Sequence, residues 1–162
     1  LRGDEMSLHI EVDMGGVNAL LQTIADDMSK ATRPASQAAA QVLYDEVKRN
    51  VAKIGKVTGN LDSSIYQVYS KKNSTDWRSA YEVSWNKQTA PHGHLVEYGH
   101  IQKFKSYIGS DGNWYTNKKA LLPQPKQVAA KPFMRPAISK FNEAMDAAKD
   151  KMLEIINKDY AR

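Results

Sequence analysis

The sequence contains no cysteine, and this absence removes several classes of function at once. Disulfide bonds, thiolate nucleophiles and cysteine-ligated zinc or iron–sulfur sites are all excluded. Long apolar runs are also missing, because no stretch approaches the roughly 20 residues that a membrane-spanning helix needs. No basic leader followed by an apolar stretch is present. We therefore expect neither a secreted nor a membrane protein.

Familiar catalytic motifs are missing as well. The turn-like segment GSDGNW lacks the lysine and the helix context of a phosphate-binding loop. No GxSxG nucleophile motif occurs. What remains is a chain of 162 residues with 41% hydrophobic and 25% charged residues, a composition typical of a globular protein. We expect one domain over residues 1–162, in which residues 1–6 are a remnant of an expression tag or a disordered start.

The net charge of +5 is not concentrated in an arginine-rich block or a basic stripe. Lysines and arginines instead occur in scattered pairs along the chain. Sequence-specific DNA recognition is therefore weakly supported. Two interpretations stay open: a lysine-rich soluble surface, or non-specific contact with nucleic acid or an acidic partner.

Two long helices are predicted by the spacing of apolar residues. From Val17 onward they recur every three or four positions, which predicts a helix from about Gly16 to Ile54, kinked or restarted at Pro34 and ended by Gly55. A second stripe follows Pro136 and runs to the C-terminus. The predicted core consists of side chains from both stripes: Leu20, Ile24, Val42, Leu43, Ile138, Phe141, Met145 and Met152.

Alternating apolar residues predict strands elsewhere. Leu8, Ile10 and Val12 share one face of a half-buried strand. Runs starting at Ile65 and at Trp77 predict an antiparallel hairpin. Residues 101–130 have no steady period and are expected to form an extended loop, an arm or a further hairpin. The predicted fold class is thus α+β, a small antiparallel β-sheet packed against two long α-helices, with a long insertion loop or hairpin.

Three of the four histidines lie in HGHLVEYGH, residues 92–100. A metal could be held by His92, His94, Glu97 and His100, which would make the protein a small metal-dependent hydrolase. The spacing matches no zinc-hydrolase pattern, since such helices space two histidines four residues apart. The other interpretation is structural: Gly99 lets the chain reverse, and Glu97 pairs with a basic group such as Arg135 or caps a backbone N–H.

Three segments in order, TGNLDSSI, HLVEYGH and KPFMRPAI, resemble the tail-completion, or neck, proteins of long-tailed bacteriophages, also called minor tail or head–tail joining proteins. The resemblance extends from about Leu8 to Ile156. The residues that carry it, and that it marks as structural, are Thr58, Gly59, Leu61, Glu97, Tyr98, Gly99, Pro132, Phe133, Arg135 and Pro136. The insert after Gly99 is longer and more aromatic than in that family.

The resemblance implies a structural virion protein that needs no cofactor or metal and performs no catalysis. It would be made in the host bacterial cytoplasm and would complete the tail and help to join it to the head. Its partners would be the connector or stopper, the tail terminator or tail tube, and other copies in a ring around the DNA channel. Trp114 and Tyr115 on the insert are the predicted partner-binding residues. A non-specific DNA-binding accessory protein is the further alternative.

Overall fold

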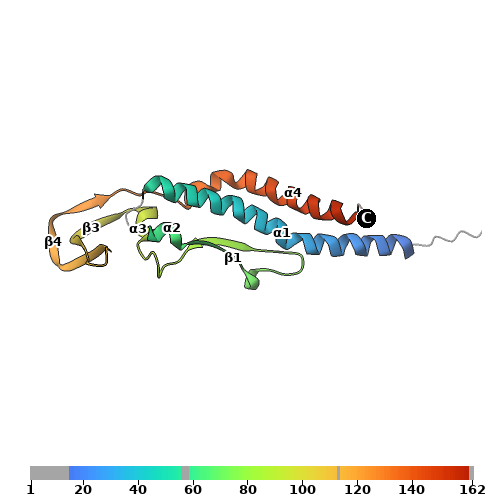
Figure 1. Ribbon diagram of the computed structural model, residues 1–162, viewed down its shortest axis with the longest axis horizontal. Coiled ribbons are helices and arrows are strands. Elements are labelled where there is room, and N and C mark those ends of the chain that lie inside the picture. Colours follow the sequence, from blue (N-terminus) through green and yellow to red (C-terminus); the bar gives the residue numbers. More distant parts are fainter. Residues whose placement is uncertain (1–14, 56–58, 113, 161–162) are drawn as a thin grey trace, which may run out of the picture.

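A single long helix forms the axis of the molecule (Figure 1). The computed structural model describes residues 15–55, 59–112 and 114–160. Helix α1, Gly15–Ile54, passes through Pro34 without a restart, so the predicted helix is confirmed as one element. At 1.5 Å per residue it is about 60 Å long. It ends before Gly55, which adopts a positive φ of 90°.

A small antiparallel sheet follows α1. The short helix α2, Asn60–Ser64, leads into strand β1, Ile65–Tyr69, which pairs along its whole length with β2, Tyr81–Trp85. The 3-10 turn η1, Lys71–Asn73, lies in the connection. The hairpin is as predicted, but its second strand does not begin at Trp77.

Trp77 lies instead in the tight turn closed by the bridge between Thr75 and Arg78. Its side chain is 63% exposed, so the apolar alternation that starts there does not reflect a buried face. The strand predicted for Leu8, Ile10 and Val12 lies outside the described residues.

The insert forms a second antiparallel pair, here called the ribbon: strands β3, His100–Ile108, and β4, Trp114–Val128. It is a separate two-stranded sheet, so the molecule has two small sheets among its described residues. The register shifts on both sides of Phe104. Such bulges bend a strand, and the ribbon curls at the end of the molecule away from α4 (Figure 1).

The C-terminal segment returns along α1 (Figure 1). The short helix α3, Gly93–Tyr98, precedes the ribbon, and the 3-10 helix η2, Arg135–Lys140, leads into α4, Phe141–Tyr160. The predicted α+β class, with a small antiparallel sheet and two long helices, is confirmed. In detail, the first sheet packs on α1, and α4 packs mainly on α1. None of the described helices has the length and apolar character needed to span a bilayer.

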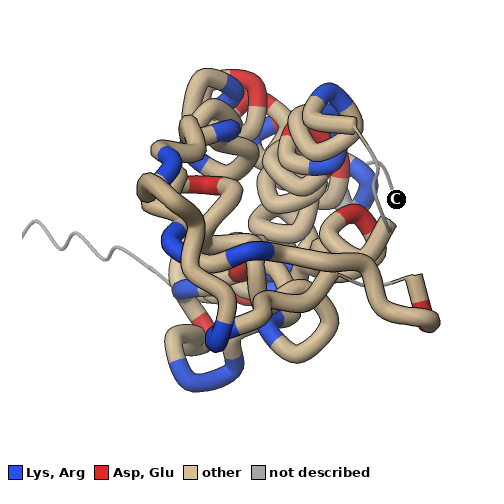
Figure 2. Tube along the Cα trace, turned by 90° about the vertical axis from the view of Figure 1, so that its left-hand side faces the viewer, with Lys and Arg blue, Asp and Glu red and all other residues tan. Residues whose placement is uncertain are grey.

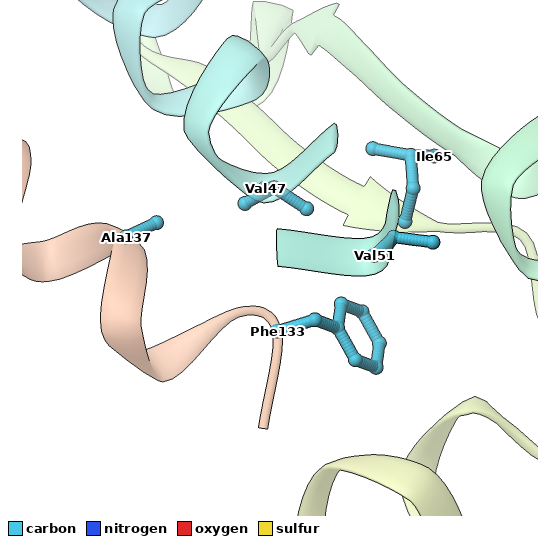
Figure 3. Close-up of a cluster of buried hydrophobic side chains, with 5 residues drawn as sticks. All are labelled: Val47, Val51, Ile65, Phe133 and Ala137. Carbon is cyan, nitrogen blue, oxygen red and sulfur yellow. The ribbon is translucent and has the colours of Figure 1, made fainter. Parts of the chain in front are cut away.

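The buried cluster lies where the end of α1 meets β1 and η2 (Figure 3). It consists of Val47, Val51, Ile65, Phe133 and Ala137. Phe133 is completely buried, and its ring meets the Trp85 ring edge-on at a centroid distance of 5.6 Å.

The predicted core was wrong in its membership. Four of its residues are more than half exposed: Leu20, Ile138, Phe141 and Met145. The other four are only partly buried: Ile24, Val42, Leu43 and Met152. The buried residues of the two helices include Ala31, Ala35 and Ala144. Because small side chains fill the contact between the two helices, several of their large apolar side chains are exposed at the surface.

Candidate functional site

The segments that carry the three sequence motifs converge on the buried cluster. Leu61 follows Gly59, which adopts a positive φ of 79° before α2, and packs against the cluster. Val96 of α3 and Met134 pack against the same cluster. Thr58 lies outside the described residues. Segments about 35 residues apart in sequence are thus held together by one apolar centre.

The carboxylate of Glu97 binds the start of the C-terminal helical segment. Its Oε2 accepts hydrogen bonds from the backbone N–H groups of Phe133 and Met134, at 2.7 and 2.9 Å. Its Oε1 accepts one from the N–H of Arg135, at 3.1 Å. The N–H groups of Phe133 and Met134 precede η2 and that of Arg135 begins it, and such groups have no partner within the helix. The carboxylate therefore caps the helical segment and complements its dipole. Glu97 itself is only 1% exposed.

The Arg135 side chain completes this arrangement, which we call the Glu97 clamp. Its Nε lies 3.0 Å from Glu97 Oε1, which confirms the expected ion pair, and its Nη2 donates to the Glu97 carbonyl oxygen at 2.7 Å. The guanidinium also lies over the exposed Tyr98 ring, 4.9 Å from its centroid. Both carboxylate oxygens of Glu97 are therefore committed to groups of this chain.

The clamp makes stability depend on pH. Burial alone would raise the pKa of the Glu97 carboxyl, but the backbone N–H groups of Met134, Phe133 and Arg135 and the Arg135 side chain outweigh it and hold the pKa below the ordinary 4.5. A lowered folded-state pKa stabilises the fold above the unfolded-state pKa, and this contribution is lost as the pH falls through the folded-state value.

We therefore predict that Glu97→Gln lowers the free energy of unfolding at neutral pH and that this difference disappears in acid. In Glu97→Gln the amide NH2 faces backbone donors, so the variant should unfold more easily at neutral pH. As the pH falls below the unfolded-state pKa of about 4.5 and on through the lowered folded-state pKa, the two unfolding free energies should approach each other. Urea unfolding of both proteins over a pH series measures this gap. A gap that stays constant down to pH values well below 4.5 would contradict the lowered pKa.

Two glycines allow the close contacts around the clamp. Gly99 has a positive φ of 72°, and an added Cβ would lie 2.7 Å from the Val128 carbonyl oxygen and 2.8 Å from the Ala130 nitrogen. A Cβ at Gly93 would lie 2.3 Å from Trp85 Nε1. The Lys131 N–H also donates to the Val96 carbonyl oxygen at 2.8 Å. The two ends of the ribbon therefore leave and rejoin the body at one place.

The two motif prolines lie on the surface on either side of Phe133. Pro132 and Pro136 are both exposed, and Pro136 stands in the first turn of η2, where a missing N–H costs nothing. Proline there fixes the backbone that presents the three N–H groups to Glu97.

The histidines do not gather around Glu97. His92 precedes α3, His94 is exposed on it, and His100 begins β3. Burial, and then the neighbouring His94, lowers the pKa of His92. Within the described residues, no three side chains of His, Asp or Glu are placed to hold a metal ion.

The ribbon exposes basic and aromatic side chains. Nearly all of its residues are exposed or half-exposed, and the predicted contact residues Trp114 and Tyr115 are 55% and 44% exposed. Tyr115 lies across from Tyr107, with ring centroids 5.8 Å apart. Between His100 and Val128 the sequence has one acidic residue, Asp111, and five lysines: Lys103, Lys105, Lys118, Lys119 and Lys126. This end of the molecule faces the viewer in Figure 2.

Some residues of the site were missed by sequence reasoning. Asn50 of α1 donates its side-chain amide to the Phe133 carbonyl oxygen at 3.3 Å, and Trp85 packs on Phe133. Capping of a backbone N–H by Glu97 was one of the two expected roles, but its donors, Phe133 and Met134, were not identified. An asparagine on the apolar face of a long helix is a usable signal, because buried amides need partners. Backbone donors leave no such trace in a sequence.

These features define a protein whose buried polar residues hold its own fold, while many of its large apolar side chains and its ribbon lysines lie exposed at the surface. A comparison with protein families matches residues 17–99 to HK97-gp10_like, described as "Bacteriophage HK97-gp10, putative tail-component". The match covers half of the chain, and the protein belongs to this family of bacteriophage tail components. No curated protein and no solved structure matches the chain.

Proposed function

We propose that the protein is a structural part of the phage neck, where it completes the tail and helps to join it to the head around the DNA channel. The observation that carries this proposal is the match to a family of tail components over α1, the first sheet and α3. The order of the three motifs, which resembles that of tail-completion proteins, supports the finer assignment to the neck. Localisation in the virion follows from the same proposal.

The surface supports a role in assembly. A two-stranded ribbon exposed on both faces is marginal by itself in water, so a neighbour that covers it would stabilise it. Its exposed aromatic residues are of the kind enriched at protein interfaces. We propose that Trp114 and Tyr115 contact a neck or tail protein such as the connector, stopper, terminator or tube. The ribbon lysines would tolerate or attract DNA phosphates in the channel without reading sequence.

The hydrolase alternative has no support in the geometry. Glu97, its candidate acid–base residue, is occupied by three backbone N–H groups and by Arg135. We propose accordingly that the protein acts through its surfaces. Of the DNA-binding alternative we keep only the non-specific contact between the ribbon lysines and DNA phosphates in the channel.

Deletion of the gene tests the neck assignment. A phage lacking the protein should accumulate DNA-filled heads and separate tails, and a plasmid copy of the gene should restore joined particles. Electron microscopy of the lysate distinguishes the outcomes. Joined, infectious particles without the protein, or a complete lack of tails, would contradict a function at the junction.

The ribbon tip gives a sharper prediction in the same complementation assay. The double change Trp114→Ser and Tyr115→Ser should leave the protein folded but strongly reduce joined particles, because aromatic anchors commonly contribute at least 2 kcal/mol each to an interface. Trp77→Ser is the matched control, since Trp77 is also exposed but lies in the turn after η1. Equal plaque yields from both variants would show that the tip makes no essential contact.

A further inference from the structure

The first four turns of α1 carry an apolar surface that no described element of the chain covers. We call it the N-terminal stripe; it consists of Val17, Leu20, Leu21, Ile24 and Met28. Four of the five are between 42% and 58% exposed, and Ile24 is partly exposed. Continuing in steps of three and four leads to Ala31 and Ala35, which are 0% and 4% exposed. One helix face is thus buried from Ala31 onward and open before it.

A groove of about 550 Å³ lies further along the same helix, between α1, β2 and the η2–α4 segment. Almost all of its lining is apolar and includes Ala39, Leu43, Val83, Ile138, Phe141 and Met145. Ile138, Phe141 and Met145 are the large side chains that the core leaves exposed. α1 contributes Ser36, Ala39 and Ala40 to the lining, and such small side chains let another helix approach closely.

The stripe and the groove match in length and character. The stripe extends from Val17 to Met28, and the α1 part of the groove extends from Ser36 to Val47. Each covers three turns of helix, or about 16 Å. An amphipathic helix that places its apolar side chains into an apolar groove is a common mode of recognition between chains.

We propose that the N-terminal stripe of one copy lies in the groove of the next copy. Within a single chain the two cannot meet, because both lie on one helix with their centres about 30 Å apart. The contact joins two different surfaces, so an open row of copies keeps a free groove at one end and a free stripe at the other. Such head-to-tail contacts build rings when the rotation closes. The inference rests on the proposed function, since it supplies the contact between copies in a ring around the channel.

The absence of cysteine allows a specific test by crosslinking. The double variant Leu21→Cys with Met145→Cys places one thiol in the stripe and one in the groove. The two lie on one chain far beyond the separation of about 7 Å between Cα atoms that a disulfide spans. Complemented virions and the purified protein are oxidised mildly and run on a non-reducing gel. We expect a ladder of covalent multimers of this chain from the virions.

Matched variants make the result specific. Leu21→Cys alone and Met145→Cys alone should stay monomeric. The pair Asn18→Cys with Met145→Cys should form little ladder, because Asn18 is exposed on α1 but lies off the stripe. Dimers from Leu21→Cys alone would overturn the proposal by showing that stripes pack on each other. A covalent link to a different virion protein, or no link at all, would overturn it too.

The two experiments distinguish a failure of the proposed contact between copies from a failure of the proposed neck function. If deletion leaves heads and tails unjoined but the double variant forms no ladder in complemented virions, the neck function stands and the proposed contact is wrong. If deletion leaves joined particles while the ladder forms, the contact between copies stands and the neck function is wrong.

Discussion

Replacing Glu97 by alanine is expected to lower the free energy of unfolding by about 3–5 kcal/mol, because it removes a buried carboxylate that is the acceptor of three backbone N–H groups. The loss leaves the N–H groups of Phe133, Met134 and Arg135 without their acceptor and the Arg135 guanidinium without its partner. Each unsatisfied buried donor costs about 1–3 kcal/mol on its own, so the effect is large even if water enters. Urea unfolding followed by circular dichroism measures it.

Arg135→Ala is the matched control for this prediction. It removes the ion pair but keeps the three backbone donors, and the Arg135 side chain is 53% exposed. Its effect should therefore be clearly smaller than that of Glu97→Ala, at about 1–2 kcal/mol. If the two variants were equally destabilised, the ion pair rather than the capping of η2 would be the main contribution of the clamp.

Replacing Phe133 by alanine should cost a similar amount, about 3–5 kcal/mol, because it opens a cavity at the centre of the buried cluster. Phe133 is completely buried against Trp85, and its neighbours come from α1, β1 and η2, which cannot collapse into the space without moving. Thermal or urea unfolding measures the loss.

Phe141→Ala provides the comparison, since Phe141 has the same side chain but is 56% exposed. It should change the stability of the isolated protein by less than about 1 kcal/mol. Because Phe141 lines the groove, the same variant should weaken the contact between copies. A large destabilisation by Phe141→Ala together with a small one by Phe133→Ala would contradict the placement of the core.

The helices and the clamp were predictable from the sequence because their signals are local or chemically distinctive. The three- and four-residue spacing persists across Pro34 and ends at Gly55, which located α1 within one residue. A glutamate and an arginine in two otherwise apolar motifs suggested the pair Glu97–Arg135, and the structure contains it. That Glu97 could cap a backbone N–H was an open alternative, but which N–H groups it caps was not predictable, because backbone donors have no signature in residue types.

The core was not predictable because periodicity tells which side of a helix is apolar but not what covers it. Leu20 and Met145 belong to good helical stripes and are still exposed, since no described element packs over them. The ribbon was expected only as a loop or hairpin for a related reason. Residues exposed on both faces need not alternate between apolar and polar types, and alternation is the signal by which a strand is recognised.

The joining of both ribbon ends at Gly99 and Ala130 has a consequence for how such proteins can diverge. The family match stops at residue 99, one residue before β3 begins, so the matched part holds α1, the first sheet and α3 but neither the ribbon nor the helices after it. A segment anchored at a single point can be lengthened, shortened or exchanged while the capped helix beside it stays intact. The ribbon, about 30 residues long, could thereby differ between related proteins while the rest of the fold is kept.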